Sequence, residues 1–426
     1  MSSRRQTMWR MRILLCVAVV AGLTWGIGNL QALECVRQKQ APSGGEDSKT
    51  AEFGKLADLA LQDDVAVSDP ALARLRELGP AAVEYLMNEP ALRNSPRWSA
   101  VIDAVAQQKD AGYCGLYWHT DLDQALAAAK RENKPVLSLR LLGNLTDELS
   151  CANSRFFRTT LYPHAGVREL LSRRFVLHWQ SVRAVPIITI DFGDGRRIRR
   201  TITGNSLHLI LDNQGRTIDV LPGLYAPAAF AQELEQSAAA AARLAAFDGE
   251  QFQQARAEFH RERTHQARVA WVNRCRAARL NESLPTGVDH QPEIWTKVAA
   301  IAGEPEVLDA TTRRAVIERG PPAEVAGRQA LAKAVTETPV MRLVRNVSRV
   351  INEDSVRNEY YLHVQIHNWF AAQKPVPERE DLVRRVYSEL FLSPLDDPWY
   401  GLSRPDVFSA IKNDGHLDAV TQNTGD

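Results

Sequence analysis

The feature that most constrains the fold is an apolar run of strand length, PVLSLRLLG at 135–143, that directly follows a helical pattern. Such a run suits a strand buried on both faces of a sheet. The stretch before it, DLDQALAAAKRENK, begins with a capping Asp and carries Leu122, Ala125 and Ala129 on one stripe, which predicts a helix. The sequence therefore predicts a layered α/β domain built around 135–143.

The same alternation continues to about residue 237. A helical stretch follows Cys151, is interrupted near Pro163 and resumes in VRELLSRRF, and FVLHWQSV then predicts a strand. The segment VPIITIDFGDGRRIRRTITGN predicts two strands around a GDG turn, and LHLIL, DNQG and RTIDVLPG predict a second hairpin. With APAAFAQELEQS as a closing helix, the predicted fold is a βαβαβ-ββα domain flanked by α-helical N- and C-terminal regions.

This order resembles the thioredoxin-like superfamily over about 115–236. The resemblance also rests on W-x-x-D before the first helix, KPVL at its end, a cysteine at the start of the second long helix, and LDNQGRTID before a PG turn. It is greatest for exported members that carry extra helical segments. In that family a C-x-x-C motif lies at a helix N-terminus, where the helix dipole stabilises a thiolate.

The resemblance implies that Cys151 fills the nucleophile position and that Ser154 replaces the second cysteine. A dithiol cycle within Cys151-Ala152-Asn153-Ser154 is then impossible, and monothiol exchange or oxidation of a thiolate remains. Ser154 would donate a hydrogen bond to that thiolate. Ser206 stands where the family places a cis-proline, and a trans bond is expected before it. Cys151 is therefore either a functional thiol or a buried structural residue.

The N-terminal segment predicts export. Four arginines within the first 12 residues precede an apolar run from Ile13 to about Gly28, which is the layout of an export signal. Cleavage near Ala32 would release a periplasmic or other extracytoplasmic protein, and retention of the run would anchor the same protein to the membrane. In both cases the rest of the chain lies outside the cytoplasm.

Composition divides the rest of the chain into further regions. The predicted divisions are a signal or anchor at 1–33, a linker at 34–50, a small helical region at 51–112, the α/β domain at 113–237, a helical region at 238–417 and a disordered tail at 418–426. The C-terminal region is expected to begin with one long helix from about Ala238. Further helices are predicted at about 309–319, 322–335, 357–372 and 377–390.

The charge composition argues against a nucleic-acid partner, and the cysteine and histidine spacing argues against a zinc site. Lys+Arg of 52 against Asp+Glu of 51 leaves a net charge of +1, so no overall field attracts nucleic acid. No set of Cys and His has zinc spacing, and we expect no cofactor. The sequence does not specify how Cys35, Cys114, Cys151 and Cys275 pair, and Cys114 is an alternative resolving thiol for Cys151.

Two further patterns have alternative interpretations. Glu359, His363 and His367 follow at intervals of four on one predicted helix and would suit a divalent metal, but their aromatic surroundings favour a packed helix with hydrogen-bonded histidines. No metal site is therefore assigned. The basic run RRIRR at 196–200 is interpreted as the solvated part of a hairpin.

Three functions remain open. The first is a monothiol oxidoreductase of the cell envelope that acts through Cys151. The second is a non-catalytic thioredoxin-like scaffold that binds a partner protein, and the third is metal-dependent hydrolysis on the histidine pair. The missing second cysteine and the missing proline favour the scaffold.

Overall fold

The computed structural model describes residues 44–202, 204–280, 285, 292–301, 308–319, 339–372, 378–400 and 410–411. The predicted export segment at 1–33 and the predicted tail at 418–426 lie outside these residues. No helix among those described is long and apolar enough to cross a membrane. The chain divides into two compact units, 1–55 and 56–426, and every site discussed below lies in the second.

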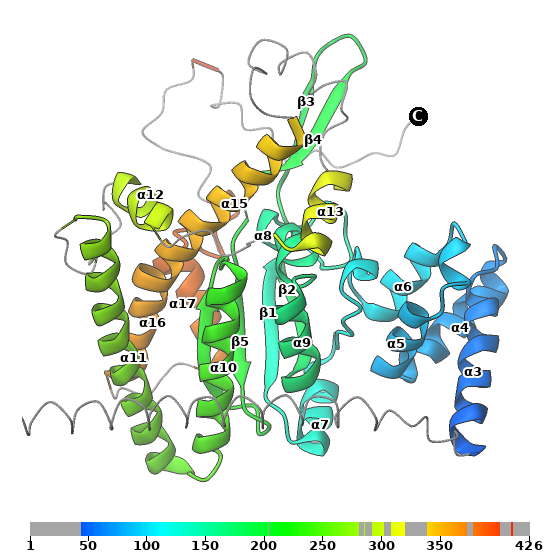
Figure 1. Cartoon of the computed structure of the whole chain (residues 1–426), viewed down its shortest axis with the longest axis horizontal. Helices are drawn as coiled ribbons and strands as arrows, with labels where there is room; N and C mark the ends of the chain where they lie inside the picture. The colour runs from blue at the N-terminus through cyan, green and yellow to red at the C-terminus, as the bar shows by residue number, and fades with distance from the viewer. Residues whose placement is uncertain are drawn as a thin grey trace, which may run out of the picture. The chain divides into compact units, whose positions relative to one another are not determined.

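A four-stranded mixed sheet confirms the mixed α/β class (Figure 1). The strand order is β2-β1-β5-β6; β1 is parallel to β2 and antiparallel to β5, which is antiparallel to β6. The strands are β1 (Val136–Leu142), β2 (Val176–Arg183), β5 (Ser206–Leu211) and β6 (Thr217–Pro222). The first strand of the predicted βαβαβ order is not formed: before α7 (Leu122–Glu132) the described residues have only a single parallel bridge, between His119 and His178 beside β2, so the described order starts with a helix.

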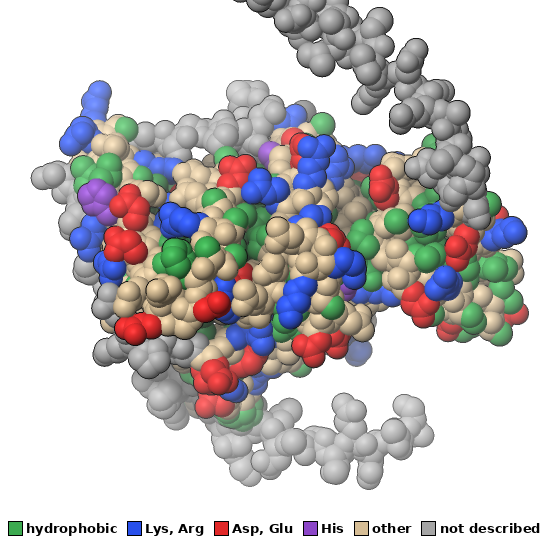
Figure 2. All heavy atoms as spheres, turned by 90° about the horizontal axis from the view of Figure 1, so that it is seen from below, with side chains coloured by type: hydrophobic (Ala, Val, Ile, Leu, Met, Phe, Trp, Pro, Cys, Tyr) green, Lys and Arg blue, Asp and Glu red, His purple; other side chains and the backbone are tan. Residues whose placement is uncertain are grey.

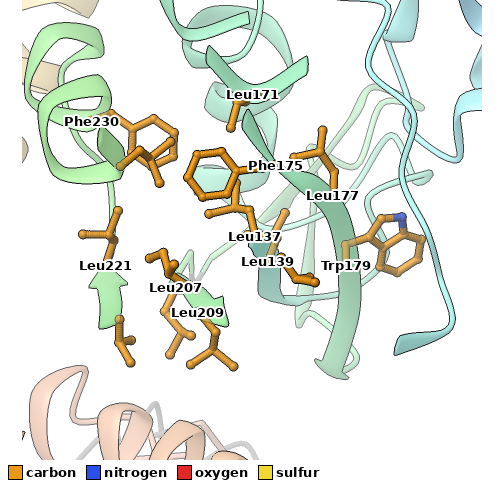
Figure 3. Close-up of a cluster of buried hydrophobic side chains, with 14 of the residues drawn as sticks. Leu137, Leu139, Leu171, Phe175, Leu177, Trp179, Leu207, Leu209, Leu221 and Phe230 are labelled. Atoms are coloured by element: carbon orange, nitrogen blue, oxygen red, sulfur yellow. The ribbon is translucent and has the colours of Figure 1, made fainter. Parts of the chain in front are cut away.

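Strands β1 and β5 are buried along their whole length, as the apolar run at 135–143 predicts. Side chains alternate between the two faces, so both faces must be covered. On one face, Figure 3 shows Phe230, Leu171 and Phe175 gathered near the sheet, and Leu207 and Leu209 point the other way.

The helices of the α/β domain follow the predicted order. They are α7 (Leu122–Glu132), α8 (Ala152–Phe156), the π-helical turn η3 (Phe157–Leu161), α9 (Ala165–Arg174) and α10 (Pro227–Leu244). The carboxylate of Asp121 caps α7 by accepting a hydrogen bond from the Gln124 N–H at 2.8 Å. Helices α9 and α10 pack together and contact β2 and β5–β6 respectively.

The N-terminal region is helical, as predicted. Its elements are α3 (Gly44–Ala60), α4 (Val65–Glu77), α5 (Pro80–Asn88), η1 (Leu92–Asn94), α6 (Trp98–Ala106) and η2 (Ala111–Tyr113). The break between α4 and α5 lies at Gly79, whose φ of 75° favours glycine. Helix α3 begins inside the predicted linker at 34–50. The polar composition of this stretch prevents it from being buried but does not prevent it from forming a helix, and Lys49 and Thr50 are exposed.

The C-terminal region is also helical, but its first helix was predicted wrongly. Helix α10 continues past the predicted boundary at 237 to Leu244, and a new helix starts at Gly249, so two helices stand where one was predicted. The elements are α11 (Gly249–Ala277), α12 (Pro292–Ile301), α13 (Ala310–Arg319), α15 (Pro339–Arg357), η4 (Asn358–Leu362), α16 (His363–Ala371), α17 (Arg379–Arg385) and η5 (Val386–Leu390). The predicted helix at 322–335 lies outside the described residues.

Strands β3 (Ile187–Asp191) and β4 (Arg197–Thr201) form a separate two-stranded hairpin, as the GDG turn predicts. In contrast to those of the main sheet, most of its large apolar side chains are exposed: Ile187, Ile190, Phe192, Ile198 and Ile202. Elsewhere charges are mixed, and the face in Figure 2 shows basic and acidic side chains interspersed.

Candidate functional site

Cys151 lies at the N-terminus of α8, where the resemblance places a nucleophile. Its sulfur is fully buried and accepts a hydrogen bond from the backbone N–H of Ser154 at 3.4 Å. The Ser154 hydroxyl donates to Ser150 Oγ or to the Cys151 carbonyl, which lie 2.7 and 2.8 Å away. Burial raises the pKa of the Cys151 thiol, and hydrogen bonds from Ser154 only partly oppose this effect.

Two segments far from Cys151 in the sequence close this site. A Cβ added to Gly204 would stand 2.8 Å from the Ala152 side chain and 3.2 Å from its nitrogen, so glycine permits the segment before β5 to lie directly on α8. The buried Tyr387 of η5 donates its hydroxyl to the Asn205 carbonyl at 2.9 Å. The peptide bond before Ser206 is trans, as expected.

Cys114 is buried as well. Its sulfur accepts a hydrogen bond from the Gln108 side-chain amide at 3.1 Å, and burial raises the pKa of the thiol to about 11. Neither Cys114 nor Cys151 forms a disulfide. Cys35 lies outside the described residues.

A polar cavity of about 340 Å³ opens beside the Cys151 turn. We call it the arginine pocket, and its lining residues are Asp110, Glu148, Leu149, Arg155, Arg158, Thr159, Arg199, Arg200, Thr201 and Arg319. The residues come from α8–η3, the β3–β4 hairpin, α13 and the loops around Asp110 and Glu148. The β3–β4 hairpin, α8–η3 and α13 therefore contribute to one pocket although they lie far apart in the sequence, and no local sequence pattern predicts it.

Two of the five arginines that line the pocket form ion pairs with its two carboxylates. The buried Arg158 pairs with Asp110 at 2.9 Å and donates to the Glu148 carbonyl at 3.1 Å. Arg319 contacts the same Asp110 and also pairs with the Glu148 carboxylate at 3.0 Å. These four groups form a neutral network.

The other three arginines have no carboxylate partner within the described residues. Arg155 donates to neutral acceptors, the Ser150 carbonyl and the Thr201 hydroxyl, the latter at 2.7 Å. Arg199 and Arg200 are exposed on β4. Among the described residues that line the pocket, five guanidinium groups and two carboxylates leave three surplus positive charges, which favours an anionic ligand.

A second polar cluster lies where β6 meets α10, α11 and α16. We call it the histidine centre, and its residues are Asp219, Glu233, His260, Arg263, His363 and His367. His363 Nε2 lies 3.0 Å from Asp219 Oδ1, and the Nδ1 atoms of His260 and His367 are 2.9 Å apart. All six residues are buried.

Burial shifts the titration of this centre. It lowers the pKa of His260 to about 4 and that of His367 well below its usual value. Burial alone would raise the pKa of Asp219, but the charge and hydrogen bond of His363 lower it well below the usual range. The same pair raises the pKa of His363 in spite of its burial.

Of the three residues spaced for a metal, the structure brings only His363 and His367 together. Glu359 lies in the π-helical turn η4, where each turn takes more residues, so the interval of four no longer keeps one face. Its carboxylate accepts a hydrogen bond from the Ser355 hydroxyl at 2.6 Å instead. Asp219 and His260 are not among the residues predicted from the sequence. A carboxylate inside the buried strand TIDVLP was the available signal, because such a residue needs a partner.

Comparison with known proteins identifies no relative: no family model, no curated protein and no solved structure matches this chain.

Proposed function

We propose that this chain is an exported thioredoxin-like binding module without thiol catalysis, which captures an acidic segment of a partner protein. The thioredoxin-like assignment is supported by the order of elements: a parallel βαβ unit, β1 and β2, precedes an antiparallel hairpin, β5 and β6, and a closing helix α10. The export assignment rests on the arginines and apolar run of the first 33 residues.

The buried thiol favours the scaffold over monothiol redox chemistry. Reactive cysteines are partly exposed and have a lowered pKa. Cys151 has neither property, because Gly204, Asn205 and Tyr387 close over the turn. The Ser154 hydroxyl also has two oxygen acceptors within hydrogen-bond distance, Ser150 Oγ and the Cys151 carbonyl.

The arginine pocket is the observation that carries the proposal. Guanidinium groups bind carboxylates through paired hydrogen bonds, and three of those in the pocket have no acidic partner within the described chain. The adjoining hairpin exposes Ile190 and Ile198 as a cross-strand pair. An isolated two-stranded hairpin is at best marginally stable, so a bound partner would stabilise it. Its exposed apolar and cationic side chains suit a partner segment that is both acidic and apolar.

A peptide of alternating glutamate and valine, labelled with fluorescein, provides the test by anisotropy with the full chain. We expect binding that weakens with added salt. Replacement of Arg199 and Arg200 by glutamate should weaken it at least tenfold, a loss of about 1.4 kcal/mol. Arg173→Glu with Arg174→Glu is the matched control, because both residues are exposed on α9 and the charge change is identical. Equal losses in both double variants would contradict the proposed site.

Alkylation of Cys151 tests the rejected alternative. In a variant that keeps only this cysteine, we expect no labelling by iodoacetamide until the chain is denatured. Rapid labelling with an apparent pKa clearly below about 8.5 would instead support monothiol chemistry.

A further inference from the structure

We propose that the histidine centre binds one divalent transition-metal ion, with Zn²⁺ the best match, through Asp219, His260 and His367. The site lies at the edge of the main sheet and is independent of the arginine pocket, so this inference goes beyond the proposed function. Its ligands come from β6, α11 and α16.

The donor set has the chemistry of such a site. Two imidazoles and one carboxylate suit Zn²⁺ and related ions. Their ligand atoms lie within 4.8 Å of one another, and the Nδ1 atoms of His260 and His367 are 2.9 Å apart. Neighbouring ligands with bonds of about 2.0–2.1 Å stand roughly 2.9–3.4 Å apart, so the two imidazoles already have the spacing of adjacent ligands. The Asp219 carboxylate lies within 4.8 Å of both ligand nitrogens.

The surrounding hydrogen bonds orient these donors. His260 Nε2 lies 3.0 Å from the Ile218 carbonyl, to which its N–H donates. That bond leaves the Nδ1 lone pair directed at His367, the arrangement in which metal-bound histidines are usually held. Asp219 accepts hydrogen bonds from the Val220 N–H at 2.8 Å and the Ser237 hydroxyl at 2.9 Å, which fix the carboxylate beside the imidazoles.

The charge balance also favours a cation. Glu233 and Arg263 neutralise each other through two contacts of 2.6 Å. Asp219 is fully buried, and its nearest cationic partner among the described residues is His363, which balances the carboxylate only when it is protonated; no lysine or arginine pairs with it. A buried carboxylate needs a compensating charge. A divalent ion between Asp219 and the two imidazoles would supply it, with His363 as a positioning residue that donates to Asp219 Oδ1.

The burial of the centre indicates the role of the ion. Catalytic zinc sites keep a position open to water and substrate, whereas structural sites are closed. Each of the three ligands is at most 2% exposed. The ion would therefore join β6 to α11 and α16 and hold the C-terminal helices on the sheet, rather than catalyse hydrolysis.

Metal content and thermal unfolding of the full chain test the proposal. The chain is refolded from guanidinium chloride with Zn²⁺, freed of unbound ion by dialysis and analysed for zinc. We expect one equivalent of zinc and a lower midpoint of unfolding after refolding with a chelator, because an ion that binds only the folded state stabilises it. Refolding with Co²⁺ should give the visible absorption of a cobalt ion with nitrogen ligands.

Single substitutions locate the ion. His260→Gln and His367→Gln should each lose the bound zinc and the effect of the chelator on the unfolding midpoint. His265→Gln, an exposed residue of the same helix α11, should keep both. A wild-type chain that is folded by circular dichroism yet retains no zinc or cobalt would overturn the proposal. Retention of a full equivalent by both His260→Gln and His367→Gln would overturn it as well.

Discussion

The two sheets of this protein differ in what stabilises them. Strand β5 is buried over its whole length and packs in a core shared with the C-terminal helices, whereas every residue of β4 is exposed or only partly buried. The arginines of the arginine pocket also divide into buried and exposed ones. Arg158 is buried and paired at the base of the arginine pocket, while Arg199 lies exposed on the hairpin. The comparison indicates that the main sheet serves stability and that the hairpin is available for a ligand.

The sharpest test of this division compares two arginines of one pocket. Arg158→Ala leaves the nearly buried Asp110 with only the outer partner Arg319, and loss of one member of a buried ion pair lowers the free energy of unfolding by about 3–5 kcal/mol. Arg199→Ala should change it by less than about 0.5 kcal/mol. Urea denaturation measures both, and similar losses would contradict the division.

Apolar substitutions in the two sheets should differ in the same way. Leu209→Ala in β5 removes a fully buried side chain and should lower the free energy of unfolding by about 2–5 kcal/mol. Ile190→Ala in β3, where the side chain is 44% exposed, should cost less than about 1 kcal/mol. A large loss for Ile190→Ala would show that the hairpin is part of the folded core.

Gly204→Ala tests how the Cys151 turn is closed. The added methyl group would clash with Ala152, and overpacking of this kind costs about 1–3 kcal/mol. The segment should therefore open more often, and iodoacetamide should label Cys151 in the folded variant, whereas the folded parent chain stays unlabelled. Gly166→Ala, at an exposed position of α9, is the control, since the nearest atom to its added Cβ lies 3.9 Å away, at ordinary contact distance. Equal rates in all three chains would mean that Gly204 does not close the site.

The pH dependence of stability should reflect the buried histidines of the main sheet. Burial lowers the pKa of His208 to about 3, below the ordinary value of 6.5, so between these values the unfolded chain binds a proton that the folded chain does not. Stability should therefore fall as the pH drops from 6.5, by about 1.4 kcal/mol per pH unit for this histidine. His208→Gln should make the slope shallower by one proton.

The sequence predicts the strands well because their signal is local. The runs around Leu137 and Leu209 are apolar over a strand length, and the turn at Gly79 needs a positive φ. It predicts the sites poorly because they are assembled over long distances. Asp219 and His363 meet across 144 positions, and Arg155 meets Thr201 across 46. No periodicity within either segment carries that information.

The faces of the C-terminal helices were predicted only in part, because a local irregularity of the helix is not visible in the sequence. The π-helical turn η4 changes the helical phase, so an interval of four misassigned Glu359 to the face of His363. The burial of Cys151 depends on Tyr387, which no motif around the cysteine reveals.

The contact of Tyr387 with Asn205, which is distant in the sequence, also has a consequence for folding during synthesis. Ile366, Phe370 and Tyr387 belong to the same buried cluster as the strands of the sheet. A polypeptide grows from its N-terminus at about 5–20 residues per second, so this cluster stays incomplete until almost the entire chain has left the ribosome. The nascent protein thus has a prolonged interval without a finished core, during which a chaperone would meet an unfolded substrate.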